Sequence, residues 1–123
     1  MKLRIRGNTL RLRLTQSEVA QVARGETVLE RSALSADSAF TYSLGAADSD
    51  VAVAALEGDH LAIHAPKSAL LQWASTDEVA VDCASDPAGS DILIEKDFAC
   101  LSPRTGEDDS DTYPHPKEGR ESC

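Results

Sequence analysis

Residues 2–14, KLRIRGNTLRLRL, alternate between apolar and cationic side chains and are interrupted once, by Gly7-Asn8. A period of two is typical of strands with one buried face, and a Gly-Asn dipeptide suits a two-residue hairpin turn. The pattern therefore predicts an N-terminal β-hairpin with one apolar face and one cationic face. The apolar side consists of Leu3, Ile5, Leu10, Leu12 and Leu14, and the cationic side of Lys2, Arg4, Arg6, Arg11 and Arg13.

A helix is expected directly after this hairpin. Thr15 followed by Glu18 is a capping-box pattern, and Gly25 offers a C-terminal stop. Between them, Val19 and Val22 belong to an apolar stripe with helical spacing. We therefore predict a short helix between Thr15 and Gly25.

The same order of features returns 51 residues later. Gly58-Asp59 corresponds to Gly7-Asn8, and Pro66 takes the place of Thr15 as a helix starter. We interpret the chain as two copies of one ββαββ unit, at about residues 2–44 and 51–98.

The remaining strands are expected at residues 27–34, 39–44, 79–84 and 91–98. About eight short strands and two short helices predict an α+β fold. We expect a mainly antiparallel sheet, curved or barrel-like, with a pseudo-twofold between the copies. Residues 1–101 form a single predicted domain, and the acidic, Pro-containing segment 102–123 is expected to pack partly on it.

Composition narrows the class of protein. A chain of 123 residues is one domain's worth, and its net charge of −9 disfavours nucleic-acid binding, which usually needs a basic footprint. No stretch approaches the ~18 apolar residues of a membrane span. The three cysteines are an odd number without the spacing of a disulfide framework, which favours a reducing, cytoplasmic environment. No pattern decides the oligomeric state.

The cationic face of the hairpin is the first candidate site. Residues 1–13 hold five cations and no acid, and subtracting these five charges from −9 leaves −14 for the other residues. Like charges directly opposite one another destabilise a strand pair, so acidic groups or an anionic partner are expected nearby. One hypothesis is that the C-terminal segment folds back over the hairpin, and the alternative is a solvated face. The candidate acids are Glu107, Asp108, Asp109 and Asp111, and the candidate anion-binding or tail-docking cations are Arg4, Arg6, Arg11 and Arg13.

The C-terminal cysteines are a second candidate. Cys100, His115 and Cys123 have the spacing Cys-x14-His-x7-Cys, and zinc prefers Cys and His ligands. Structural zinc sites usually contain close pairs such as CxxC, which this chain lacks, so no cofactor is expected and zinc is the alternative. A Cys100–Cys123 disulfide or a redox-responsive thiol is a further alternative. We interpret Cys83 as a buried small apolar residue.

Three other polar residues have simpler interpretations. His60 and His64 are expected on one polar strand face, about 7 Å apart. Asp97 has the opposite parity to Ile94 and Phe98, so we expect it to face outward and to cap or tether the C-terminal segment. Tyr113 and the neighbouring prolines are expected to anchor that segment. The chain contains no nucleophile elbow, metal-binding His-Glu helix or nucleotide motif.

The order of these features resembles a family of small bacterial proteins, a domain of unknown function. The matching stretches are residues 2–19, 68–79 and 95–116, of which the third, EKDFACLSPRTGEDDSDTYPHP, is the most specific. The family resembled tends to have Asn after the Pro that corresponds to Pro114, where this chain has His115. The resemblance implies a stand-alone cytoplasmic domain and no known activity. We therefore expect a non-enzymatic domain that binds a protein or a small anionic ligand, and the alternative is an enzyme acting on an anionic substrate at the arginines.

Overall fold

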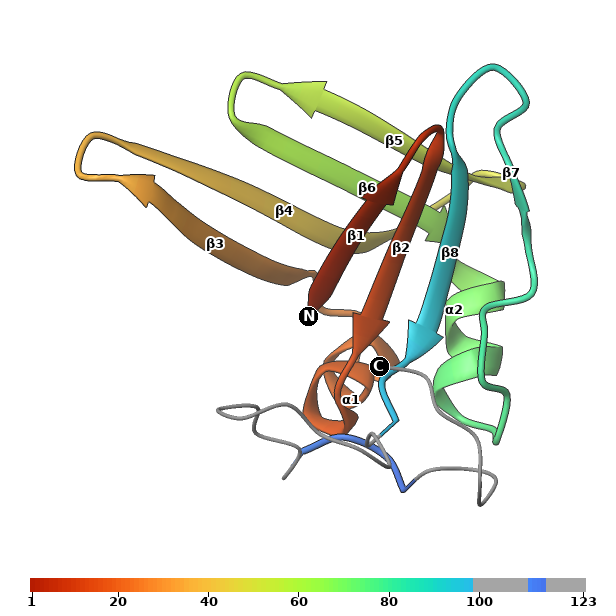
Figure 1. Ribbon diagram of the computed structural model, residues 1–123. Helices are drawn as coiled ribbons and strands as arrows, with labels where there is room; N and C mark the ends of the chain where they lie inside the picture. Colours follow the sequence, from red (N-terminus) through yellow and green to blue (C-terminus); the bar gives the residue numbers. More distant parts are fainter. Residues whose placement is uncertain (99–110, 115–123) are drawn as a thin grey trace.

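The computed structural model describes residues 1–98 and 111–114. Both helices lie at the same end of the molecule, below the two sheets in Figure 1, which confirms the predicted α+β class. The elements in chain order are β1 (Lys2–Arg6), β2 (Thr9–Leu14), α1 (Gln16–Ala23), β3 (Val28–Ser35), β4 (Ser38–Ala47), β5 (Val51–Glu57), β6 (His60–Pro66), α2 (Lys67–Ala74), β7 (Ala84–Ser85) and β8 (Asp91–Lys96).

The strands form two open sheets with the orders β1-β2-β8 and β3-β4-β6-β5-β7. Antiparallel pairs join β1 to β2, β3 to β4 and β5 to β6. The pairs β2–β8, β4–β6 and β5–β7 are parallel. The expectation of one mainly antiparallel, barrel-like sheet was therefore wrong. Alternation specifies which face of a strand is buried, but it does not specify the direction of a neighbour that comes from a distant part of the chain.

Both predicted hairpin turns are present. Gly7 and Gly58 have φ values of +54° and +58°, and among the described residues only glycines have positive φ. A positive φ at the first central position is the pattern of a type II′ turn, whose twist matches that of the flanking strands. Arg6 consequently faces Thr9, and Glu57 faces His60.

The helices begin as the sequence predicts. The Thr15 main-chain N–H donates to Glu18 Oε1 at 2.9 Å, and the Glu18 N–H donates to Thr15 Oγ1 at 3.4 Å, so the capping box is formed. Pro66 occupies the N-cap of α2, directly before the first turn in which it was expected. Each helix has eight residues, and no helix in the described part of the chain is long and apolar enough to cross a membrane.

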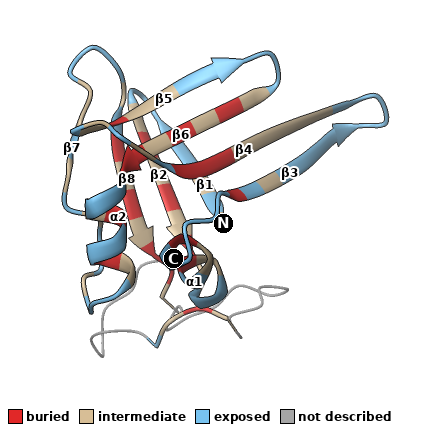
Figure 2. Cartoon of the chain, turned by 180° about the vertical axis from the view of Figure 1, so that it is seen from behind, coloured by how far each residue is buried: buried red, intermediate tan, exposed pale blue. Residues whose placement is uncertain are grey.

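The core lies between the facing sides of the sheets and is closed at one end by the helices. The buried bands of β2, β4, β6 and β8 lie inside the molecule, while the outer half of β3 is exposed (Figure 2). The core residues are Leu10, Leu12 and Leu14 of β2, Ile92 and Ile94 of β8, Val28, Leu44, Ala52, Leu61, Ile63 and Ala65 of the larger sheet, and Val19, Val22, Leu70 and Trp73 of the helices.

The strand predicted at residues 79–84 is mostly absent. Only Ala84–Ser85 forms β7, while Ala80 makes an isolated antiparallel bridge to Glu95. The Trp73 indole N–H donates to the Val79 carbonyl at 2.9 Å, which ties this segment to α2. The Val79 carbonyl also accepts a hydrogen bond from the Lys96 N–H, and the Val81 N–H donates to the Ile94 carbonyl, so pairing with β8 is confined to residues 79–81.

Candidate functional site

The candidate site is the solvent-facing side of the three-stranded sheet, which we call the arginine face. Successive side chains of a strand point to opposite sides, so burying Leu10, Leu12 and Leu14 places the cations of the hairpin outside. The arginine face comprises Lys2, Arg4 and Arg6 of β1, Thr9, Arg11 and Arg13 of β2, and Asp91, Leu93 and Glu95 of β8.

Cations of the two hairpin strands lie directly opposite one another. Arg4 pairs with Arg11, and Lys2 pairs with Arg13. Opposed like charges raise the free energy of the hairpin. An anion placed between Arg4 and Arg11 relieves this repulsion.

Neutralisation of the arginine face is uneven. Glu95 Oε1 lies 3.3 Å from Arg11 Nε and 3.8 Å from Arg13 Nε, so one carboxylate serves two arginines. Lys2 Nζ lies 3.1 Å from Asp97 Oδ2. Arg4 and Arg6 form no ion pair with a described residue. Positive charge is therefore least compensated near the hairpin turn.

A small hollow lies at this uncompensated end. It has a volume of about 150 Å³ and is lined by Arg4, Arg6, Thr9 and Arg11. This volume is below the ~300 Å³ at which pockets for drug-sized ligands begin. The hollow suits a single phosphate or carboxylate group, to which arginine donates paired N–H groups. Thr9 was not among the site residues predicted from the sequence, although its register opposite Arg6 places it beside the cations.

The arginine face differs in charge from the protein as a whole. Its five cations, together with Asp91, Glu95 and the adjacent Asp97, give a net charge of +2, whereas the whole chain carries −9. A positive surface on an acidic protein attracts anions locally while the net charge opposes their general adsorption.

Asp111 lies at the start of α1. Its carboxylate accepts a hydrogen bond from the Ser17 hydroxyl, and its carbonyl accepts one from the Gln16 N–H at 3.0 Å. The hydrogen bonds from Ser17 and Thr15 lower the pKa of Asp111. A carboxylate is favourable at a helix N-terminus. The other predicted tail acids, Glu107, Asp108 and Asp109, lie outside the described residues, so their docking on the hairpin stays a prediction.

Residues 111–114 are attached to the end of β8. The Tyr113 N–H donates to the Asp97 carbonyl at 2.8 Å, and the rings of Tyr113 and Phe98 lie 5.5 Å apart. Lys96 Nζ lies 5.6 Å from the centroid of the Tyr113 ring. Asp97 tethers the segment as predicted, through its main chain. The expectation that Asp97 faces outward was wrong, because it is 2% exposed and pairs with Lys2.

The candidate zinc ligands Cys100, His115 and Cys123 lie outside the described residues, so this prediction also stays open. Within residues 1–98 and 111–114, no three His, Cys, Asp or Glu side chains are close enough to hold a metal. Cys83 is half-buried and packs against the core, and burial raises the pKa of its thiol. That environment keeps the thiol protonated and agrees with the predicted role of a small apolar residue.

The two histidines of β6 are half-buried on the outer face of the larger sheet. His60 Nδ1 lies 2.7 Å from Thr41 Oγ1, and His60 Nε2 lies 3.0 Å from Ser43 Oγ. Four residue steps of ~3.3 Å separate His60 from His64, about 13 Å along the strand. The expected spacing of about 7 Å was therefore wrong, and the two rings do not form one metal site.

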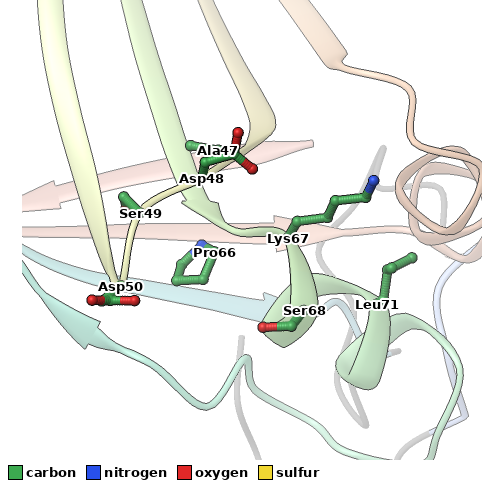
Figure 3. Close-up of a pocket in the computed structure, with 8 residues that line it drawn as sticks. All are labelled: Ala47, Asp48, Ser49, Asp50, Pro66, Lys67, Ser68 and Leu71. Atoms are coloured by element: carbon green, nitrogen blue, oxygen red, sulfur yellow. The ribbon is translucent and has the colours of Figure 1, made fainter.

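A second hollow, of about 400 Å³, lies between the β4–β5 connection and the start of α2. Figure 3 shows Asp48 and Asp50 on the connection and Lys67, Ser68 and Leu71 on the helix. The N-terminus of α2 has no side-chain cap. Carboxylates near it already supply the negative charge that a helix N-terminus favours, so we assign it no ligand.

The start of β1 is held by a charge cluster that sequence patterns do not reveal, because the main-chain amine of Met1 belongs to no side-chain motif. This amine is fully buried and lies 2.5 Å from Glu18 Oε2 and 2.6 Å from Glu30 Oε1. The Tyr42 hydroxyl donates to the Met1 carbonyl at 2.8 Å. Burial by itself lowers the pKa of the amine, but the hydrogen bonds and charges of Glu18 and Glu30 more than offset this effect, and the pKa is raised.

Comparison with known proteins identifies a matching family but gives no activity. The model of a family described as "Family of unknown function (DUF7009)" matches residues 1–117. No curated protein and no solved structure matches the chain.

Proposed function

Since the chain belongs to this family of unknown function, we propose its role from the site alone: it is a non-enzymatic module that binds an anionic group on the arginine face. The observation that carries this proposal is the hollow lined by Arg4, Arg6, Thr9 and Arg11. Arg4 and Arg6 have no ion pair with a described residue, so their donors are available to a ligand.

The groups that line the hollow support binding rather than catalysis. Arginine stays protonated in proteins and provides only donors. General acid–base catalysis usually relies on His, Glu, Asp, Lys, Tyr or Cys, and none of these side chains lines the hollow. The ligand is therefore recognised by charge and geometry and leaves unchanged.

The test is a titration of the full chain with inorganic pyrophosphate, followed by NMR chemical shifts at low and at high salt. We expect shifts concentrated at Arg4, Arg6, Thr9 and Arg11, and weaker binding at high salt, because exposed charges are screened. The double variant Arg4→Glu/Arg11→Glu is expected to weaken binding at least tenfold. Arg31→Glu, on the exposed strand β3, is the matched control. An equal loss in the control, or no binding by the unmodified protein, contradicts the proposal.

The acids Glu107, Asp108 and Asp109 are an internal candidate for the same face. If they dock there, replacing all three with the corresponding amides removes a competitor and strengthens pyrophosphate binding. Protease cleavage within residues 102–110 then also becomes faster at high salt in the unmodified chain. Cleavage and affinity that are insensitive to these changes would speak against internal docking.

The proposal includes a cytoplasmic location, which rests on the three cysteines and their spacing. Fractionation of native cells with an antibody against the protein tests it directly. Recovery in an oxidising compartment, with disulfide-bonded cysteines, would contradict it.

We also propose that the chain is a duplication whose halves exchange strands. β2 pairs in parallel with β8 of the second half, and β6 pairs in parallel with β4 of the first half. In the first of these parallel pairs Thr9 faces Asp91, and in the second His60 faces Thr41. His60 lies 51 residues after Thr9, and Asp91 lies 50 residues after Thr41, so the two pairs have nearly the same register. Each half then depends on the other, so separately produced halves 1–50 and 51–123 are expected to fold only when mixed. Independent folding of either half contradicts the exchange.

A further inference from the structure

The geometry points to β1 as an edge to which an extended acidic polypeptide from a partner protein adds as a fourth strand. This inference rests on the proposed function, because the same arginines would receive the acidic side chains. It goes further in naming the ligand as a polypeptide and the main chain of β1 as part of the site.

The main chain of β1 has one unpaired side. β1 is the outer strand of the three-stranded sheet, and Arg6 and Thr9 close its two-residue turn. The residues that flank such a turn exchange hydrogen bonds, and this pattern alternates along the ladder. Leu3 and Ile5 therefore direct their N–H and C=O groups away from β2. No described residue outside β2 forms a hydrogen bond with the main chain of either.

The other sheet edges suit a partner strand less well. The outer side of β8 is already bonded to residues 79–81, because the Val81 N–H donates to the Ile94 carbonyl and the Lys96 N–H donates to the Val79 carbonyl. β7 has only two residues. β3 is longer, but it ends in a register shift between Ala33 and Ser35, and such irregularities disturb edge pairing. β3 also carries Glu30 and Arg31, which present both signs of charge. β1 alone among these edges combines free main-chain groups with an adjacent cationic hollow.

The two faces of β1 define the side chains of the partner. A strand added beside β1 places every second side chain next to Arg4 and Arg6, where ~5 Å separates opposed Cβ atoms. Carboxylates at these positions reach the arginines and the hollow. The intervening side chains lie beside Leu3 and Ile5, of which Ile5 is 60% exposed. Burying apolar surface there is favourable, so the partner segment alternates acidic and apolar residues.

The edge is held ready for pairing. The Met1 amine is fixed by Glu18 and Glu30, and Lys2 is fixed by Asp97. A rigid edge loses little conformational freedom when a strand is added, which favours binding. Because Tyr42 already binds the Met1 carbonyl, the added strand covers Leu3 to Arg6 and remains short.

The test uses a synthetic seven-residue peptide of alternating glutamate and valine, titrated into the full chain and followed by calorimetry. Two N-methylated versions of the peptide are compared, one methylated at the glutamate nitrogens and the other at the valine nitrogens. They carry the same charge, but their remaining N–H groups lie on opposite edges of the extended peptide. One version is expected to lose at least tenfold in affinity, while the other stays within about twofold, because only one edge of the peptide faces β1. A peptide with its glutamates and valines in separate blocks is expected to bind more weakly.

A protein variant provides an independent readout. Ile5→Pro removes an N–H that points away from β2, and proline is tolerated at such positions of an edge strand. We expect Ile5→Pro to weaken peptide binding at least tenfold while pyrophosphate binding changes by less than about twofold. Ile5→Ala, which keeps the N–H, is the matched control and separates the loss of the apolar side chain from the loss of the donor.

The outcomes distinguish the inference from the proposed function. If both N-methylated peptides bind equally well and Arg4→Glu/Arg11→Glu abolishes binding, charge alone is recognised, so strand addition is overturned and anion binding stands. If pyrophosphate binds and the peptides do not, strand addition is also overturned. If neither binds, both proposals fail.

Discussion

The Met1 amine helps to position the arginine face, because it fixes the start of β1. The Met1 amine has no exposure to solvent and is held between Glu18 and Glu30. Glu18 also caps α1, so the same side chain joins the first strand to the first helix. Burying a charge is tolerated only when it is paired in this way.

This pairing gives stability a defined dependence on pH. The pKa of the amine is raised above its ordinary value of 8.0, so its contribution is complete below pH 8 and is lost as the pH rises through the folded-state pKa. The pKa of Glu18 is lowered from 4.5: burial opposes this shift, but hydrogen bonds from the Met1 amine and from Thr15 more than offset it. Its contribution is complete above pH 4.5 and is lost as the pH falls through the folded-state pKa.

Glu18→Gln is therefore expected to lower the free energy of unfolding by about 1.5 kcal/mol at neutral pH, because a hydrogen bond to a charged group is lost. Glutamine preserves the capping box, so the change isolates the ion pair. The measurement is urea unfolding of untagged protein that begins at Met1. The difference from the unmodified protein should shrink above pH 8 and below pH 4.5, and Glu26→Gln, at an exposed position, serves as the control. A difference that is constant from acid to alkali would falsify this account.

At the scale of elements, the hairpin combines a role in binding with a cost in stability. Arg4 lies opposite Arg11 across the β1–β2 pair, and replacing one of two opposed like charges removes a repulsion. Arg4→Thr is expected to raise the free energy of unfolding of the ligand-free protein by about 0.5 kcal/mol while weakening pyrophosphate binding severalfold. Chemical unfolding and calorimetry measure the two effects, with Arg31→Thr as the control. A loss of both stability and binding would indicate that Arg4 acts through structure.

The segment 111–114 is a second element with a testable contact. Tyr113 packs on Phe98 and lies over Lys96. An aromatic pair contributes ~1 kcal/mol beyond its buried area, so Tyr113→Ala is expected to lower stability by about 1–2 kcal/mol. It should also accelerate proteolysis between residues 99 and 113. Tyr113→Phe keeps the ring and should behave like the unmodified protein; equal effects of the two variants would mean that the ring contact is unimportant.

At the scale of the whole molecule, local signals predicted local structure well. The turn glycines, the capping box and the alternation of β2 specified the two hairpins, the two helices and the cationic side of the sheet. The parallel β2–β8 and β4–β6 pairs were not predictable in this way, because no turn connects these strands. The same limitation affected Asp97, whose burial depends on Lys2 and on the returning segment, and Thr9, whose role depends on the shape of a hollow.

The zinc alternative is also decided at this scale, by the composition of the intact protein. We expect native mass spectrometry of untagged protein, purified under reducing conditions, to give a metal-free mass with three titratable thiols after unfolding. Cys100, His115 and Cys123 lack the close ligand pair of structural zinc sites. Bound zinc that disappears in Cys100→Ser or Cys123→Ser, and persists in Cys83→Ser, would establish a metal site instead.

The parallel pairing of β2 with β8 has a consequence for biosynthesis. The strand that completes the arginine-bearing sheet ends at Lys96, so the N-terminal hairpin emerges from the ribosome long before its neighbour exists. An isolated two-stranded hairpin is only marginally stable in water, and contacts between distant residues slow folding. The nascent chain therefore carries a cationic hairpin without its third strand until residues 91–96 have been synthesised.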